Sequence, residues 1–102
     1  MKAIIEFLRQ LQCNNNREWF NAHKAEFLKH QDRFHELVEE VIREVSVFDP
    51  DLATLTPKDC TFRIYRDVRF SADKSPYKCH FGAFLAKGGK KSGNSGYYFH
   101  IS

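Results

Sequence analysis

Apolar residues recur at helical spacing through the first half of the chain. Between residues 16 and 47 they return every three or four positions, and no Gly or Pro interrupts the run. This period corresponds to one face of a helix, so we expect residues 16–47 to be mostly helical, with a bend near 30–32 where the apolar stripe lapses. Residues 2–12 repeat the spacing and predict a first, short helix. We expect these apolar residues of the long helix to face a sheet: Phe27, Phe34, Val41 and Val45.

The two predicted helices are separated by Cys13 and three asparagines. Asparagine is favoured at helix starts because its side chain can accept a hydrogen bond from an unpaired backbone N–H of the first turn. With Asn15 as the N-cap, Glu18 falls three residues later and completes a capping box. We therefore expect the long helix to begin next to Asn15.

The second half of the chain changes to apolar residues at every second position, which is the period of a half-buried strand. This alternation predicts strands at 60–70, 79–86 and 97–102. Turn-forming residues at 71–76 and a Gly- and Lys-rich segment at 87–96 connect them. The expected fold class is α+β, with N-terminal helices, one of them long, packed on an antiparallel sheet of about three strands.

With 102 residues, the chain is expected to form one α+β domain over 1–102. Because the sequence stops inside the third predicted strand, we expect this domain to be the N-terminal part of a longer protein. No apolar run approaches the roughly 18 residues that a membrane span needs, and the N-terminus makes a poor signal peptide. The expectation is a cytoplasmic protein with no membrane partner.

The cysteines and histidines show no pattern typical of a metal site. Cys13, Cys60 and Cys79 are odd in number and lack C-x-x-C spacing, so we expect three free thiols in or near the core. The five histidines have no regular ligand spacing, although His80 and His100 would be neighbours if their strands paired. We therefore expect no metal and no cofactor.

Charge is distributed unevenly along the chain. Residues 1–57 carry seven Lys or Arg against ten Asp or Glu, a net charge of −3, whereas residues 58–102 carry nine against three, a net charge of +6. Such asymmetry favours an anionic partner for the second half. The alternative is that the two halves simply attract each other.

Three arginines lie three residues apart on the first predicted strand. The planar guanidinium fork of arginine suits carboxylate and phosphate groups. Strict alternation places Arg63 and Arg69 on the polar face but Arg66 among apolar positions, where an unpaired charge would be costly. Either a bulge at Arg66–Asp67 turns Arg66 to solvent, or Arg66 pairs with a carboxylate of the long helix. The candidate carboxylates are Glu36, Glu40 and Glu44.

The turn that follows adds further candidates for a ligand site. Lys74, Tyr77 and Lys78 supply hydrogen-bond donors close to the arginine strand, and turn backbone amides can contribute to an oxyanion cradle. His80 is a weak candidate for a catalytic acid or base, because imidazole titrates near neutral pH. The loop 87–96 does not match the phosphate-binding pattern G-x-x-x-x-G-K-[ST] and is expected to be a flexible connection.

Several segments together resemble one bacterial family. They are NNNREWF at 14–20, FDP at 48–50, PKD at 57–59, FRIYRDVRFS at 62–71, DKSPYK at 73–78, HFGAF at 80–84 and GYYFHI at 96–101. On these segments the chain resembles the DUF2461 family, to which no activity is assigned. The resemblance implies an α+β, cytosolic protein, and it implies that this chain is the N-terminal half of a longer one.

Three functions of different classes remain open. The leading hypothesis is a module that recognises an anion, a phosphate or a carboxylate, and that forms half of an enzyme active site if the protein is an enzyme. Its ligand-binding residues would be Arg63, Arg66, Arg69, Lys74, Tyr77 and Lys78. The second is nucleic-acid binding through the basic half, with Tyr65, Tyr77 or Tyr97 stacking on bases. The third is a structural or interaction domain whose charges pair internally, with the remainder of its own full-length chain as a partner.

Overall fold

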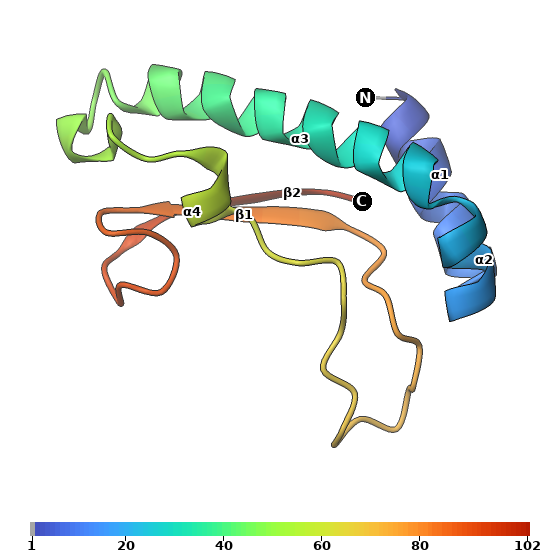
Figure 1. The fold of residues 1–102 in the computed structure, drawn as a ribbon. Coiled ribbons are helices and arrows are strands. Elements are labelled where there is room, and N and C mark those ends of the chain that lie inside the picture. Colours follow the sequence, from blue (N-terminus) through green and yellow to red (C-terminus); the bar gives the residue numbers. More distant parts are fainter. Residues whose placement is uncertain (1) are drawn as a thin grey trace.

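The computed structural model describes residues 2–102 and shows the expected α+β fold (Figure 1). Helices come first along the chain, and a two-stranded antiparallel sheet comes last. The expected count of about three strands is therefore one too high for the described residues. The elements are α1 (Lys2–Cys13), α2 (Arg17–Ala22), α3 (Lys24–Val45), the 3₁₀ helix η1 (Pro50–Leu52), α4 (Pro57–Cys60), β1 (Phe81–Ala86) and β2 (Gly96–Ile101).

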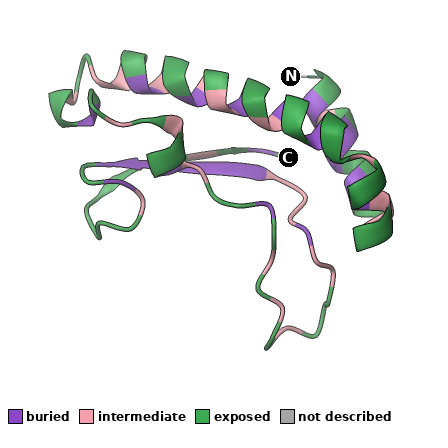
Figure 2. Cartoon of the chain, viewed as in Figure 1, coloured by how far each residue is buried: buried purple, intermediate pink, exposed green. Residues whose placement is uncertain are grey.

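Helix α3 lies along one face of the sheet, and the core forms between them (Figures 1 and 2). The rings of Phe27 and Phe34 stack on Phe81 of β1, with centroids 5.9 and 5.3 Å apart. The buried stripe of α3 continues through Val38 and Ile42. The predicted helical face is thus confirmed for both phenylalanines, whereas Val41 and Val45 are only partly buried at the edge of the core.

The helical run breaks at His23 and not near 30–32, where α3 is continuous. His23 has a non-helical backbone (φ −113°, ψ 16°), and both its backbone N–H and its ring Nδ1 lie within hydrogen-bond distance of the Trp19 carbonyl oxygen. The N-cap of α2 is Asn16, whose side chain accepts a hydrogen bond from the Trp19 N–H at 2.8 Å. The prediction of Asn15 as the N-cap is wrong, which leaves the Asn15 side chain available for another contact.

The predicted strand at 60–70 is wrong as a regular element. Only Thr61 and Tyr65 form isolated bridges, to Ala83 and Tyr77 respectively. Alternation holds at Ile64, which is 4% exposed, but it fails at Phe70, which is 95% exposed. The segment instead forms one arm of a long, irregular hairpin that extends away from the helical layer (Figure 1).

Three further features bear on the expectations from sequence. The cysteines are free; Cys60 is buried and Cys79 is intermediate, but Cys13 is exposed, so the expectation that it lies in or near the core is wrong. Over residues 2–102, no cluster of three or more His, Cys, Asp or Glu side chains is arranged to hold a metal ion. Among the helices in that range, none has both the length and the apolar character needed to cross a membrane.

Candidate functional site

The hairpin between α4 and β1 is held together by pairing that changes register along its length. Thr61 lies opposite Ala83, and Tyr65 lies opposite Tyr77. The chain therefore advances four residues on one arm and six on the other between these bridges. The two additional residues bulge out of the second arm around residues 78–82. Bulges re-aim side chains and are common next to functional sites, and here Lys78, Cys79 and His80 of the bulge line a cavity.

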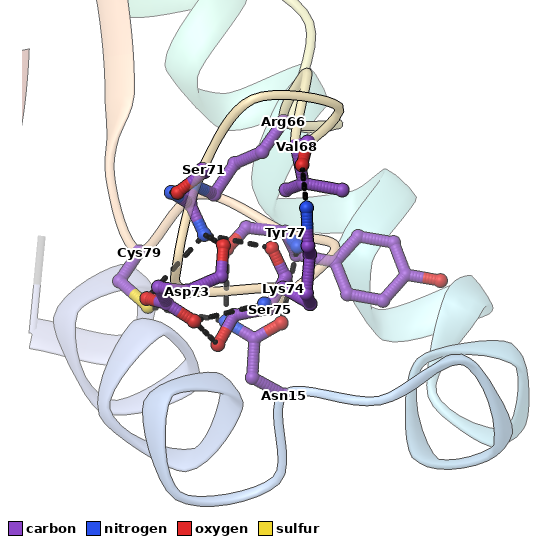
Figure 3. Close-up of polar contacts among 9 residues, drawn as sticks. All are labelled: Asn15, Arg66, Val68, Ser71, Asp73, Lys74, Ser75, Tyr77 and Cys79. Atoms are coloured by element: carbon purple, nitrogen blue, oxygen red, sulfur yellow. Dashed lines mark hydrogen bonds and ion pairs between the residues drawn. The ribbon is translucent and has the colours of Figure 1, made fainter.

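Asn15 fixes this hairpin to the helical layer (Figure 3). Its side-chain amide donates to the Tyr77 carbonyl oxygen at 2.8 Å, and its Oδ1 accepts from the Tyr77 N–H at 3.0 Å. The amide thus pairs with one residue of backbone as a neighbouring strand would. On the other side of the same residue, the buried Tyr77 ring stacks on Phe20 of α2 with centroids 4.0 Å apart.

Arg66 closes the hairpin from within (Figure 3). Its Nη1 donates to the carbonyl oxygens of Ser75 at 2.9 Å and Asp73 at 3.3 Å, and it lies 3.4 Å from the Asp73 carboxylate. Its Nη2 lies 3.5 Å from the Ser71 hydroxyl. Neither predicted explanation of Arg66 holds, because the bulge is on the opposite arm and the carboxylate belongs to the hairpin itself. Arg66 is nonetheless paired with a carboxylate, that of Asp73.

A cavity of about 370 Å³ lies between the hairpin and α2. Arg17 reaches it from the first turn of α2, and Arg63 and Arg66 reach it from the hairpin. We call it the arginine cavity. No carboxylate is among the residues that line it, which are Arg17, Asn21, Arg63, Tyr65, Arg66, Val68, Pro76 and Tyr77.

The cations of the arginine cavity are largely unneutralised. Within residues 2–102, neither Arg17 nor Arg63 forms an ion pair, whereas Arg66 pairs with Asp73 outside this cavity. Burial and the nearby Tyr65 raise the pKa of Tyr77, and Arg17 opposes that rise. The Tyr77 phenol is therefore protonated at neutral pH and available as a hydrogen-bond donor. The cavity presents positive charge and donors together.

A second cavity, of about 420 Å³, lies on the other side of Arg66 next to the bulge. Burial lowers the pKa of Lys78 and of His80, and in each case a neighbouring cation adds to the effect. Burial also raises the pKa of the Cys79 thiol. We call this the bulge cavity; its lining residues are Gln12, Asn15, Arg66, Asp73, Ser75, Tyr77, Lys78, Cys79 and His80. Because the Asp73 carboxylate lines the bulge cavity together with Arg66 and Lys78, this cavity carries both negative and positive charge.

The structure divides the predicted ligand-binding residues into three groups. Arg63, Arg66 and Tyr77 meet in the arginine cavity, while Lys78 lies with His80 in the bulge cavity. Arg69 and Lys74 line neither cavity.

The two outlying residues have partners of their own. Arg69 pairs with Asp67 at 2.9 Å, which lowers the pKa of Asp67 and raises that of Arg69. Lys74 donates to the Val68 carbonyl oxygen at 2.6 Å and so ties the two arms together. Arg69 and Lys74 therefore stabilise the hairpin tip.

Three contributors to the site were not predicted from the sequence. Arg17 and Asn21 line the arginine cavity from α2, and Asn15 holds the hairpin against the helices. The tripeptide of asparagines was visible as a helix start, but nothing in its spacing indicates a contact 62 residues away. The predicted proximity of His80 and His100 is confirmed, with ring centroids 5.6 Å apart.

Comparison with known proteins gives a family but no activity. The family model described as "Conserved hypothetical protein (DUF2461)" matches residues 3–102, in agreement with the resemblance seen in the sequence. No curated protein and no solved structure matches the chain.

Proposed function

The chain belongs to the DUF2461 family, and we propose that it recognises a small organic anion, a phosphate or a carboxylate, in the arginine cavity. One observation carries the proposal. Three arginines from two parts of the chain, Arg17, Arg63 and Arg66, line one cavity whose wall contains no carboxylate. Within residues 2–102, Arg17 and Arg63 have no ion-pair partner, and a bound anion would relieve the repulsion between the gathered cations.

The cavity wall also indicates what kind of anion fits. Its volume of about 370 Å³ lies in the range of small-molecule sites, roughly 300–1,000 Å³. Besides the arginines it contains the apolar side chains of Val68 and Pro76 and the exposed ring of Tyr65. An inorganic phosphate would leave this wall without a partner. A phosphomonoester or carboxylate with an apolar, planar group would contact both the arginines and the apolar wall of the cavity.

Arg66 supports the proposal because its position is fixed before any ligand binds. Contacts with Ser71, Asp73 and Ser75 hold its guanidinium, so less side-chain entropy is lost on binding. Arg17 and Arg63 are not held in this way and would close on the ligand from either side. His80 lines the bulge cavity and not the arginine cavity, so the proposal is one of recognition, with no catalytic role for His80.

The proposal is tested by titrating phenyl phosphate and inorganic phosphate into the protein by calorimetry. We expect phenyl phosphate to bind more tightly. Arg63→Gln and Arg17→Gln should each weaken it by about tenfold or more, since a hydrogen bond to a charged group contributes about 1.5–3 kcal/mol. Arg69→Gln is the matched control, because Arg69 is on the same hairpin but paired with Asp67. Equal effects of Arg63→Gln and Arg69→Gln would contradict a defined cavity.

Nucleic-acid binding is the second candidate, favoured by the exposed rings of Tyr65 and Tyr97 and by the basic hairpin. Tyr77 does not support it, because its ring is buried against Phe20. A polynucleotide would contact Arg63 and Arg69 alike, and its affinity would fall steeply with salt. A titration with single-stranded oligonucleotide at two salt concentrations separates this function from a single-anion cavity.

A further inference from the structure

Lys78 is a partly buried lysine whose amine has no polar partner. Within residues 2–102, its Nζ forms no ion pair and no hydrogen bond. By contrast, Lys74 on the same hairpin donates to the Val68 carbonyl oxygen at 2.6 Å. An ammonium group that loses water on folding and gains no counter-ion is destabilised relative to the neutral amine. Lys78 is therefore placed as a reactive amine is, and not as a structural one.

The groups around Lys78 add to this preference for the neutral amine. Its Nζ lies 5.7 Å from the centroid of the Phe62 ring, a contact that offsets only part of the lost hydration. Burial lowers the pKa of Lys78, and the positive charge of Arg63 lowers it further. The lone pair of a neutral amine is a nucleophile, and lysines that are desolvated or placed beside another cation are activated in this way.

The bulge cavity supplies the other groups that an amine needs for reaction with a carbonyl compound. Lys78, His80 and Arg66 all line it, and its volume of about 420 Å³ is that of a small-molecule site. Burial, then His100 and the charge of Lys78, lower the pKa of His80, so its imidazole is neutral at pH 7 and can accept a proton. The guanidinium of an arginine binds carboxylates. The cavity wall thus combines a nucleophile, a proton carrier and a group that recognises an acid.

We propose that Lys78 forms an imine with a small aldehyde or ketone that carries a carboxylate, bound in the bulge cavity next to Arg66. The amine lone pair adds to the carbonyl carbon, and the π electrons of the C=O bond move to the oxygen. His80 carries one proton from the nitrogen to that oxygen, which gives a carbinolamine. The nitrogen lone pair then forms the C=N bond as the C–O bond breaks, and the oxygen leaves as water with the second nitrogen proton.

Trapping with sodium cyanoborohydride tests this reaction, because the reagent reduces an imine to a stable secondary amine. The protein is incubated with glyoxylate and the reagent at about pH 7, and mass spectrometry of the digested protein follows the adduct on each lysine with time. We expect Lys78 to be modified at least about fivefold faster than Lys91, which is exposed. Acetaldehyde has no carboxylate for Arg66, so its preference for Lys78 should be smaller.

Two variants separate the reactivity of the amine from its accessibility, with circular dichroism to show that each is folded. Arg63→Gln removes a neighbouring positive charge, so it should raise the pKa of Lys78 and slow its trapping. Arg69→Gln is the matched control, because Asp67 already neutralises Arg69. His80→Gln should slow trapping by glyoxylate but leave acetylation of Lys78 by acetic anhydride unchanged, since acetylation expels acetate and needs no proton delivered to a hydroxyl group.

The pH dependence of trapping gives the decisive comparison. The ratio of the Lys78 rate to the Lys91 rate should fall between about pH 7 and about pH 10, because the lysine with the lowered pKa becomes fully neutral first. A constant ratio would mean that access alone sets the rates and would overturn the proposal, as would trapping of Lys78 no faster than that of Lys91. An equal preference of acetaldehyde for Lys78 would overturn the role of the carboxylate, whatever the affinity of the arginine cavity for phenyl phosphate.

Discussion

Asn15 shows how much one side chain contributes to the position of the site. Both halves of its amide pair with the backbone of Tyr77, and Tyr77 lines both cavities. Asn15→Ala leaves a partly buried N–H and C=O of Tyr77 without their partners, which costs about 1–3 kcal/mol. Asn14→Ala is the control, because the Asn14 side chain makes one exposed hydrogen bond, to the Gln10 carbonyl oxygen of its own helix. Urea unfolding should show a clearly larger loss for Asn15→Ala, and similar losses would mean that the hairpin does not depend on this contact.

His80 gives the protein a stability that depends on pH. Burial, then His100 and Lys78, lower its pKa below 6.5. The folded state therefore binds a proton less readily than the unfolded chain, and the free energy of unfolding should fall as pH drops below about 6.5. His100→Gln removes one cause, so it should raise the pKa of His80 and flatten this fall. An NMR titration of the His80 ring in both proteins measures the shift, and an unchanged pKa would contradict it.

Part of the site could be predicted from the sequence because it lies within one hairpin. Arg63, Arg66 and Tyr77 are close along the chain, and their side chains are recognisable as hydrogen-bond donors for an anion. Arg17 and Asn15 could not be found in this way, since their contribution depends on how α2 and the preceding turn dock against the hairpin. Spacing rules describe residues on one element and say little about residues brought together by packing.

At the scale of elements, α3 was predictable and the first strand was not. Helical periodicity depends on local hydrogen bonds, and one buried stripe on α3 is enough to reveal it. A strand also needs a partner in register. Here the partner arm has two more residues between Tyr77 and Ala83 than the first arm has between Thr61 and Tyr65, and these interrupt the ladder. The alternation of residues 60–70 was genuine at Ile64, but beyond Arg66 no strand lies alongside it.

Phe34 lies where α3 packs on the sheet, and we expect it to contribute strongly to the free energy of unfolding. Phe34 is 1% exposed and contacts Phe81 and Phe99 from both strands. Phe34→Ala should lower the free energy of unfolding by about 3–5 kcal/mol, because it removes a buried ring and leaves a cavity. Leu28→Ala on the same helix is the control, because Leu28 is 45% exposed. Urea unfolding compares the two, and a small effect of Phe34→Ala would contradict the packing of α3 on the sheet.

At the scale of the whole molecule, the opposite charges of the two halves do not neutralise each other through ion pairs. Of the ion pairs formed within residues 2–102, only that between Lys87 and Asp51, at 4.0 Å, joins the acidic half to the basic half. Glu40 and Glu44 of α3 make no such pair. Direct ion pairs between the halves therefore do not account for the positive charge around the arginine cavity.

Because few ion pairs join the two halves, we expect added salt to have little effect on the free energy of unfolding but to weaken anion binding. Exposed ion pairs contribute about 0–1 kcal/mol each and are screened. Raising NaCl from about 50 to about 500 mM should therefore change the free energy of unfolding by less than about 1 kcal/mol. The affinity for phenyl phosphate should fall over the same range, because its charge meets unneutralised arginines. Urea unfolding and calorimetry at both concentrations measure the two effects. A large loss of stability in salt, with no loss of affinity, would mean that the arginines serve the fold.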